Sequence, residues 1–411
     1  MNVPFMAIAS IETIRKHFPA LDRIHNGRPV VYFDAPGGTQ VPRVVAEAMT
    51  DYLVHHNANT HWLYPTSEET DAIIDRSREA VADLINATPQ EIAFGANMTT
   101  LTFHLGRALG RTWQTGDEVI VTELDHHGNV APWRALEVDR GIVVQMARMI
   151  PETVQIDYGH LASLVSPRTK LIAVGGASNA TGTINDLGRV AAIAREASAL
   201  FFVDAVHLAP HELIDVQTLG CDFLACSSYK FYGPHAGILF TRRALLDVLP
   251  FPKLDPAPDW SPERAETGTQ NHEAIAGIGV TIDFLASLAG DAGTRRERLA
   301  RTYETLKIRG SVQARMLWDG LRSLPKVHVF GPPPSEPRTP TVSFTIDGVH
   351  PDDIARRLAS AGLFCSNGDF YAATCIERLG CPDGIVRVGC ACYTTDDEVG
   401  RLVYEVATIG Q

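Results

Sequence analysis

The sequence predicts an α/β protein, with a large domain built on a mainly parallel β-sheet and a smaller α+β domain after it. Several short apolar runs lie in the first two thirds of the 411-residue chain, and they do not alternate with polar residues. This pattern is expected for strands that are covered on both faces. Helical stretches such as 187–199 separate several of the runs, which is the βαβ rhythm of a parallel sheet.

Five apolar runs are the predicted strands of this sheet: residues 118–122, 171–175, 200–204, 223–227 and 237–241. After about residue 285 the sequence predicts a long charged helix, a strand, a helix, a second strand and a closing helix, over residues 294–324, 341–346, 351–361, 385–388 and from 395 onward. We therefore expect a large domain over residues 30–285, and a small domain that combines residues 1–29 with residues 286–411.

The composition excludes several classes of function. A formal net charge of −12 argues against nucleic acid as the main partner and against docking on an anionic membrane, because both need a basic face. No apolar run approaches the roughly 18 residues that a membrane-spanning helix needs. Residues 1–10 lack the basic segment of a signal peptide, so none is expected.

The seven cysteines show neither a disulfide framework nor the spacing of a zinc site. We expect reduced thiols, no metal site and a cytoplasmic protein. Most of the cysteines are expected to be small buried hydrophobic residues: Cys221, Cys226, Cys365, Cys375, Cys381, Cys390 and Cys392.

Two polar residues leave neighbouring predicted strands. Asp204 ends one strand, and Lys230 follows the next strand along the chain. Ligands of open α/β sheets bind at the carboxyl ends of the strands, so these two side chains are expected to share a site. Pyridoxal 5′-phosphate (PLP) needs both, a lysine for the Schiff base and an acid beside its pyridine nitrogen. A structural ion pair is the alternative for the two residues taken alone.

A phosphate cradle is predicted where a short strand leads into a helix over 101–109. Thr99 and Thr100 lie at the start of this helix, and helix N-termini with hydroxyl side chains bind phosphate. Plain N-capping is the alternative for this segment.

A ring-stacking group and a carboxylate fork are also present. His126 follows the strand over 118–122 and could stack on the cofactor ring. The pair His126–His127 could equally bind a metal ion, but no third ligand is obvious nearby. Arg387, on a short strand of the small domain, is a candidate for binding the carboxylate of an amino-acid substrate. The alternative for a lone arginine is a surface ion pair.

Together these segments resemble the class-V aminotransferase family and, within it, the cysteine-desulfurase-like branch. The most specific motifs are His-His-Gly-Asn at 126–129, Ser-Asn-Ala-Thr-Gly-Thr at 178–183, Val-Asp-Ala-Val-His at 203–207 and Ser-Ser-Tyr-Lys-Phe-Tyr-Gly-Pro at 227–234. The resemblance implies PLP as cofactor and the PLP-dependent transferase fold type I (aspartate-aminotransferase-like) with a sheet of the seven-stranded type. It also implies a homodimer and a small-molecule amino acid as substrate.

The resemblance implies a role for each matching residue around the ring. Lys230 carries PLP and then moves protons, Asp204 pairs with the pyridine nitrogen, and His126 stacks on the ring. His207 stands where the family often has a glutamine that touches the phenolic oxygen. Asn179 lies near that oxygen and near the substrate's carboxylate.

Further roles follow at the two ends of the site. Thr99 and Ser227 match residues that hold the phosphate. Thr269 matches a threonine that reaches the phosphate of the partner subunit across a dimer interface. Arg387 matches the arginine that binds the carboxylate of the substrate.

One loop departs from the desulfurase pattern. Desulfurases carry a mobile nucleophilic cysteine there, whereas this chain reads Ser-Asn-Gly-Asp-Phe-Tyr-Ala over 366–372, with Tyr371 at the cysteine's place. Tyr371 cannot form a persulfide, but it could act as an acid or base, or form an aromatic wall of the pocket. Cys365 and Cys375 lie close in sequence and out of register, so we expect packing roles for them.

These features favour β-elimination, or another C–S or C–Se lyase reaction, on a cysteine-like amino acid. Trp62 and Tyr64 would make one side of the pocket apolar and suit a larger substrate. An aminotransferase or an amino-acid epimerase is the alternative within the family. A non-catalytic PLP-binding protein is the alternative of another class. A nicotinamide dehydrogenase is disfavoured because no G-x-G-x-x-G motif follows any predicted strand.

Overall fold

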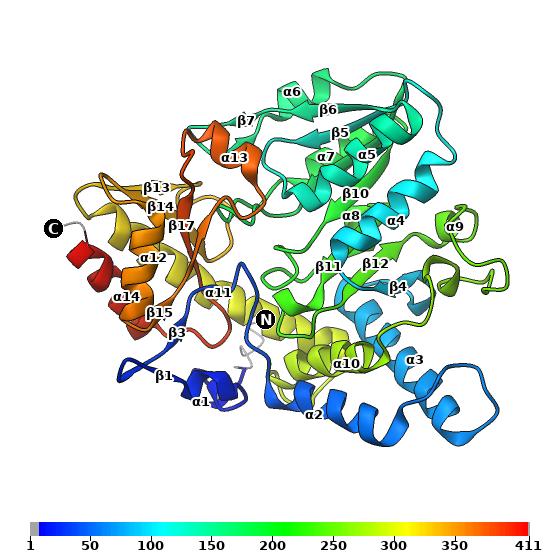
Figure 1. Ribbon diagram of the computed structural model, residues 1–411, viewed down its shortest axis with the longest axis horizontal. Helices are drawn as coiled ribbons and strands as arrows, with labels where there is room; N and C mark the ends of the chain where they lie inside the picture. Colours follow the sequence, from blue (N-terminus) through cyan, green and yellow to red (C-terminus); the bar gives the residue numbers. More distant parts are fainter. Residues whose placement is uncertain (1–7, 410–411) are drawn as a thin grey trace, which may run out of the picture.

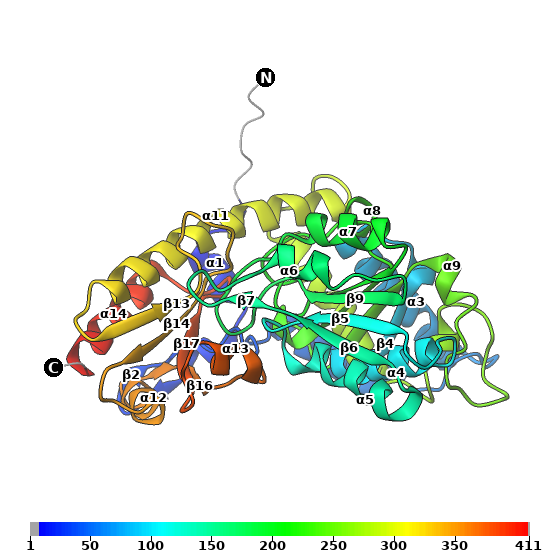
Figure 2. The same cartoon turned by 90° about the horizontal axis from the view of Figure 1, so that it is seen from above.

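The computed structural model describes residues 8–409, which form two lobes (Figure 1). The expectation about a signal peptide falls mostly on residues 1–7, outside the described part of the chain. The long helix α11 (Arg295–Arg322) runs along both lobes and joins them (Figure 2). Its N-terminus is fixed by a capping box between Thr294 and Glu297.

The larger lobe contains a seven-stranded sheet with the order β4-β12-β11-β10-β9-β5-β6. Its strands are β4 (Ile92–Gly95), β5 (Glu118–Thr122), β6 (Val143–Ala147), β9 (Thr169–Gly175), β10 (Leu200–Asp204), β11 (Phe223–Ser227) and β12 (Gly237–Thr241). All neighbours are parallel except β12, which is antiparallel to both β11 and β4. The predicted mainly parallel sheet is therefore confirmed, whereas β6 is not among the strands predicted from the sequence.

Each strand alternates between two hydrophobic clusters, one on each face of the sheet. On one face, Val119 and Phe202 pack with α4 (Met98–Gly110) and α5 (Ala131–Arg140). On the other, Ile120 and Val203 pack with α3 (Pro65–Ile85), α7 (Leu187–Glu196) and α10 (His272–Ser287). Because both faces are covered, the strands are apolar throughout. Figure 2 shows the sheet between α4 and α5 on one side and α7 on the other.

The smaller lobe has a four-stranded antiparallel sheet, β13-β14-β17-β16, over Val327–Phe330, Thr341–Ile346, Ile385–Gly389 and Ser366–Gly368. Helices α12 (Pro351–Ser360), α14 (Asp396–Ile409) and the second half of α11 pack against it. The short strand β3 (Val31–Tyr32) pairs with β15 (Leu363–Phe364), which brings the start of the chain to this lobe. The division of the chain at residues 30 and 285 stays a prediction.

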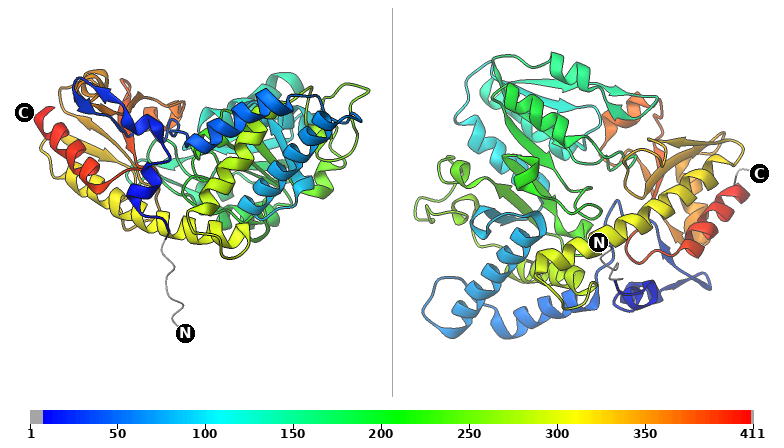
Figure 3. Two further views of the ribbon diagram at one scale, coloured as in Figure 1. Left: turned by 90° about the horizontal axis from the view of Figure 1, so that it is seen from below. Right: turned by 180° about the vertical axis from the view of Figure 1, so that it is seen from behind.

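Helix α11 holds the lobes in one arrangement. Figure 3 shows it running from beside α10 to the smaller lobe. Arg309, near its middle, donates to the carbonyl oxygen of Cys392, and Tyr303 donates to the carbonyl oxygen of Ala209 at 2.9 Å. Within residues 8–409, no helix has the length and apolar character needed to cross a membrane.

Candidate active site

A cavity of about 320 Å³ opens at the carboxyl ends of β5, β9, β10 and β11. Every one of these strands contributes a polar residue just beyond its last apolar side chain, and the start of α4 closes one end. The lining residues that carry chemistry are Thr99, Asp125, His126, Asn179, Asp204, His207, Ser227 and Lys230. The sheet therefore gathers residues that lie up to 131 positions apart, from Thr99 to Lys230 (230 − 99).

The amine of Lys230 lies in this cavity, held by carbonyl oxygens of the segment that follows β3. Its Nζ donates to the oxygens of Pro36 at 2.6 Å and of Gly37 at 3.0 Å. Burial, together with the nearby charge of Arg387, lowers the pKa of Lys230 to about 7, against the opposing effect of Asp204. A sizeable fraction of the amine is therefore neutral near pH 7, as a nucleophile or base requires.

Asp204 ends β10 and is only 6% exposed. Its Oδ1 accepts a hydrogen bond from the amide of Val206 at 2.9 Å. Burial, together with the charge of the neighbouring Asp125, raises the pKa of Asp204 to about 7. A buried acid with so few donors needs a cationic or N–H partner from the cavity to hold its charge.

Asp125 is a site residue that the sequence analysis did not single out. Its Oδ2 accepts from the amide and the hydroxyl of Thr122 at 2.8 and 2.9 Å, and its Oδ1 accepts from the amide of Gly175 at 2.5 Å. It thus ties the end of β5 to the end of β9. Burial raises the pKa of Asp125 to about 6. Its position three residues after the end of β5 was the available signal.

His126 offers a neutral ring to the cavity. Its Nδ1 accepts from the amide of Gly128 at 2.8 Å, which places the ring hydrogen on Nε2. Burial lowers the pKa of His126 to about 4. His127 turns elsewhere, toward the hydroxyl of Thr374 at 3.2 Å, so the two histidines do not converge. No cluster of three or more His, Cys, Asp and Glu side chains suited to a metal ion occurs within residues 8–409.

The N-terminus of α4 forms the end of the cavity suited to an anion. The Oγ of Ser227 accepts from the amide of Met98 at 2.9 Å, which leaves the hydroxyl hydrogen available. Thr99 lines the cavity, whereas the side chain of Thr100 is exposed and its amide is capped by Asn97 at 2.9 Å. Gly128 lets the backbone approach closely, since a Cβ there would lie 2.9 Å from the Thr99 hydroxyl.

Arg387 lies on β17 and is 3% exposed. Its Nη1 donates to the carbonyl oxygen of Asn179 at 2.8 Å, and its Nη2 lies 3.5 Å from the hydroxyl of Ser366. Its Nε is buried and has no hydrogen-bond partner within the described residues. Burial lowers the pKa of Arg387 to about 9. The Nε–Nη2 edge is therefore available for a carboxylate, which is the geometry of a bidentate pair.

Two of the residues predicted to bind the cofactor contact other groups or lie elsewhere in the single chain. His207 lines the cavity, but its Nε2 is 3.2 and 3.1 Å from the hydroxyls of Thr339 and Thr341. Thr269 is exposed and borders a separate cavity of about 540 Å³ beside Arg78 and Glu266. In the single chain, four predicted site residues are thus absent from the lining of the main cavity: Thr100, Thr269, Tyr371 and Arg387. Arg387 is joined to that lining by its hydrogen bond to Asn179.

The loop over 366–372 lies at the edge of the site. Tyr371 is 74% exposed, and its ring centroid is 5.7 Å from that of His126. The backbone is pinned, because the amide of His127 donates to the Tyr371 oxygen at 2.7 Å and the Tyr371 amide donates to Asp369 at 2.9 Å. Burial raises the pKa of the Cys365 and Cys375 thiols to about 12. Both thiols are therefore protonated at neutral pH and poor nucleophiles.

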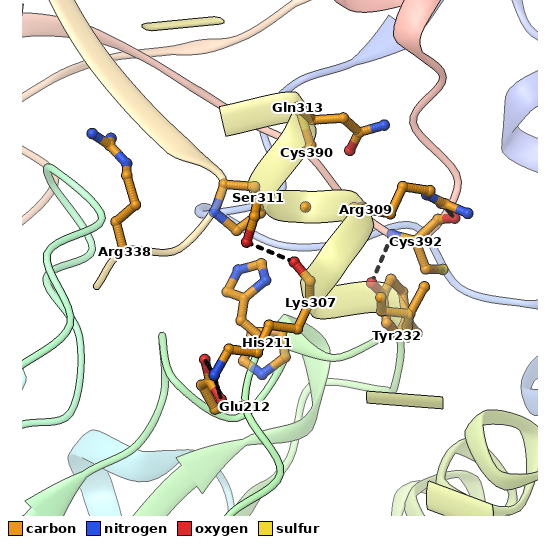
Figure 4. Close-up of a pocket in the computed structure, with 15 residues that line it drawn as sticks. His211, Glu212, Tyr232, Lys307, Arg309, Ser311, Gln313, Arg338, Cys390 and Cys392 are labelled. Atoms are coloured by element: carbon orange, nitrogen blue, oxygen red, sulfur yellow. Dashed lines mark hydrogen bonds and ion pairs between the residues drawn. The ribbon is translucent and has the colours of Figure 1, made fainter. Parts of the chain in front are cut away.

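A smaller cavity of about 30 Å³ lies between α11 and the segment after β17 (Figure 4). Its polar groups pair with one another. Lys307 binds Glu212 at 2.8 Å, and the amide of Cys392 donates to the Tyr232 hydroxyl at 2.9 Å. Its volume suits about one or two water molecules and no cofactor.

Comparisons with known proteins agree with this geometry. The family model Aminotransferase class-V matches residues 31–402. The chain is 31% identical over 409 residues to a cysteine desulfurase of Pectobacterium carotovorum, with 96% of each chain covered. Among solved structures, the apo cysteine desulfurase from Thermococcus onnurineus NA1 superimposes with a TM-score of 0.87 at 27% identity, covering 98% of this chain and 99% of that one. The cysteine desulfurase CsdA of Escherichia coli gives 0.84 at 25% identity, with 98% of each chain covered. The predicted fold class is thereby confirmed.

Proposed function

This chain belongs to the class-V aminotransferase family of PLP-dependent enzymes, and from this premise we propose that it is a cysteine-desulfurase-like lyase. It cleaves the C–S or C–Se bond of a cysteine-like amino acid by β-elimination. The observation that carries the proposal is a contrast within one site. The amine of Lys230 and the acid of Asp204 line the cavity and Arg387 donates to the lining residue Asn179, whereas the loop at the edge of the site carries Tyr371 and no thiol.

Three features of the cavity fit PLP. Its volume of about 320 Å³ is in the range of small-molecule sites. The buried acid Asp204 needs a cationic or N–H partner, which a protonated pyridine nitrogen supplies. The far end offers hydroxyl and amide donors at the start of α4. The residues that would hold the cofactor are Lys230 covalently, Asp204 at the pyridine nitrogen, His126 on the ring face, His207 and Asn179 beside the phenolic oxygen, and Thr99 and Ser227 at the phosphate.

The protein's own groups then select and activate the substrate. PLP, when bound, supplies an electron sink for the pair left at Cα. Arg387 binds the α-carboxylate through its Nε–Nη2 edge, where the carboxylate replaces the long contact of Nη2 with Ser366, and Asn179 orients that arginine. When it is not bonded to the cofactor, the amine of Lys230 takes the Cα proton, because its lowered pKa of about 7 leaves a sizeable fraction of it neutral near pH 7.

The reaction balances without a thiol acceptor. The Cα–H bond and the Cβ–S bond break, and sulfur leaves with the electron pair of its bond and takes up a proton. Water hydrolyses the three-carbon remainder to pyruvate and ammonium, so no oxidant or reductant is required. The high pKa of Cys365 and of Cys375 supports this ending, because neither thiol is poised to take sulfur. We propose that Tyr371 forms an aromatic wall, since its exposed side chain lies beside the ring of His126.

The unit in solution is proposed to be a homodimer in the cytoplasm. Thr269 is exposed and lies outside its own chain's cavity, as a residue that reaches a partner's phosphate would be. Trp62 and Tyr64, which were expected on one side of the pocket, do not line the main cavity of this chain. Trp62, Leu63 and Tyr64 are 59%, 97% and 45% exposed, and three adjacent exposed apolar side chains favour burial in an interface.

A substrate screen tests the proposed reaction. The holoenzyme is incubated with cysteine, cysteine S-conjugates and alanine, and sulfide, pyruvate and exchange of the α-proton are assayed. Pyruvate from S-conjugates supports the lyase. Amino-group transfer without pyruvate would replace it with an aminotransferase, and α-proton exchange with inversion would replace it with an epimerase. Binding of PLP without any turnover would indicate a non-catalytic protein.

A further inference from the structure

Phe370, Asn179 and Arg387 form a closed set of three contacts. The Arg387 guanidinium lies over the Phe370 ring, with Cζ 4.0 Å from the ring centroid. Nη1 of Arg387 donates to the Asn179 carbonyl at 2.8 Å, and the Asn179 side-chain amide donates to the Phe370 carbonyl at 2.9 Å. Asn179 follows β9 of the larger lobe, and the other two residues belong to the smaller lobe. The set therefore joins the lobes directly at the site.

These contacts decide which part of the guanidinium stays free. The ring of Phe370 covers one face, and the carbonyl of Asn179 occupies Nη1. What remains is the Nε–Nη2 edge, whose Nε is buried and has no partner within residues 8–409, and whose Nη2 makes only a long 3.5 Å contact with the Ser366 hydroxyl. A planar guanidinium held at one face and one corner cannot rotate freely, so less entropy is lost when a carboxylate binds.

The backbone of Phe370 is also unusual for an aromatic residue. Its φ is +56°, and the next residue, Tyr371, has φ +57°. Left-handed conformations are unfavourable for bulky side chains and persist where the surroundings enforce them. Here the Asn179 amide holds the Phe370 carbonyl, and the His127 amide holds that of Tyr371. Phe370 is only partly buried, so core packing alone does not explain this conformation.

We propose that Phe370 is a positioning residue for the substrate's α-carboxylate, because its ring and its carbonyl fix Arg387 and Asn179 and leave the Nε–Nη2 edge to receive that carboxylate. This inference rests on the proposed function, in which Arg387 binds that carboxylate. Phe370 then contributes to the affinity for amino acids and contributes nothing to the affinity for amines that lack the carboxylate.

A pair of ligands separates this role from a structural one. L-Alanine and ethylamine differ by the carboxylate alone, and binding of each to the holoenzyme is followed by the change in visible absorption of the cofactor. In Phe370→Met, the loss of a cation–π contact weakens binding of L-alanine roughly 3- to 30-fold. Binding of ethylamine changes by less than about 2-fold, since it makes no contact with Arg387. Phe370→Tyr keeps the ring and restores the affinity for alanine.

Controls keep the outcomes distinct. Phe364→Met removes an aromatic ring of the same lobe that packs on His25 and Tyr32, and it should leave both affinities unchanged. Equal weakening of both ligands in Phe370→Met, or no change in either, overturns the role of Phe370. If Phe370→Met does not fold, Phe370→Leu takes its place under the same criteria. A wild-type enzyme that binds alanine no better than ethylamine refutes the proposed carboxylate site at Arg387 itself.

Discussion

The Nζ of Lys230 donates a 2.6 Å hydrogen bond to the carbonyl oxygen of Pro36. Lys230 follows strand β11 of the large sheet, and Pro36 lies in the segment that follows β3, which pairs with a strand of the smaller lobe. In the same segment, a Cβ on Gly37 would lie 3.4 Å from Nη2 of Arg387. One segment of the chain thus lies against both the amine proposed to hold the cofactor and the arginine proposed to hold the substrate.

Two adjacent threonines provide a matched test of the phosphate cradle. Thr99 lines the cavity, whereas the Thr100 side chain is exposed on the same helix turn. We expect Thr99→Ala to weaken PLP binding roughly 10- to 100-fold, the value of a hydrogen bond to a charged group. Thr100→Ala should change it by less than about 2-fold. Fluorescence titration of the apoprotein with PLP measures both. Equal effects of the two substitutions would place the phosphate elsewhere.

Asp204 should make the stability of the apoprotein depend on pH. Its folded-state pKa of about 7 lies above the value of 3.8 for an ordinary aspartate. The folded state therefore binds a proton more tightly than the unfolded state, and stability is lost as the pH rises from about 4 to about 7. Each tenfold change in proton affinity is worth about 1.4 kcal/mol, so the loss over this window of roughly three pH units is about 4 kcal/mol.

Urea unfolding of wild type and Asp204→Asn at several pH values measures this effect. The stability of the variant relative to wild type should increase across the same pH window, because asparagine does not ionise. PLP should remove the contribution of Asp204 to the pH dependence of the wild type, since the pyridine nitrogen then pairs with the carboxylate. A stability difference that is independent of pH would contradict the raised pKa.

The dimer prediction has a complementation test. Thr269→Val should lower the affinity for PLP, although Thr269 does not line its own chain's cavity. In a mixed dimer of Thr269→Val and Lys230→Ala chains, one site has Lys230 from one chain and Thr269 from the other, so one high-affinity site per dimer should return. Thr267→Val, whose hydroxyl contacts His104 in its own chain, is the control. Full affinity in Thr269→Val, or a monomer in sedimentation, would refute the interface.

Tyr371 is proposed to act as a wall and not as an acid or base. Its ring lies beside His126, and its backbone carries the hydrogen bonds that pin the loop. Tyr371→Phe should therefore keep kcat within about 3-fold, whereas loss of a general acid or base typically costs 100-fold or more. Steady-state pyruvate formation from the best S-conjugate measures this. A fall of that larger size in Tyr371→Phe would make Tyr371 catalytic.

The residues that follow a strand were predictable, because the carboxyl ends of parallel strands meet at one edge. Asp204, His126 and Lys230 were found in this way. Strand β6 was not predicted, because it is an edge strand with mostly half-exposed residues and no continuous apolar run. The antiparallel direction of β12 was not predicted either, because an apolar run carries no direction.

Contacts between distant segments were the other limit. Phe370 lies in the turn after β16 and Arg387 lies on β17, 17 positions later (387 − 370), and their stacking depends on a left-handed backbone at Phe370 itself. Asp125 was not predicted as a site residue, because the two histidines that follow it were the more obvious functional candidates. Both side chains contact a residue that is distant in sequence, Arg387 for Phe370 and Gly175 for Asp125, and only the fold brings these residues together.

The fate of the sulfur atom tests the central claim most directly. After incubation with L-cysteine, pyruvate and alanine are quantified, and the peptides that contain Cys365 and Cys375 are analysed by mass spectrometry under non-reducing conditions. The account predicts pyruvate and free sulfide, with no added sulfur on either peptide. Alanine in amounts matching sulfur bound to Cys365, Cys375 or any other cysteine would contradict it and make the protein a sulfur-transferring desulfurase.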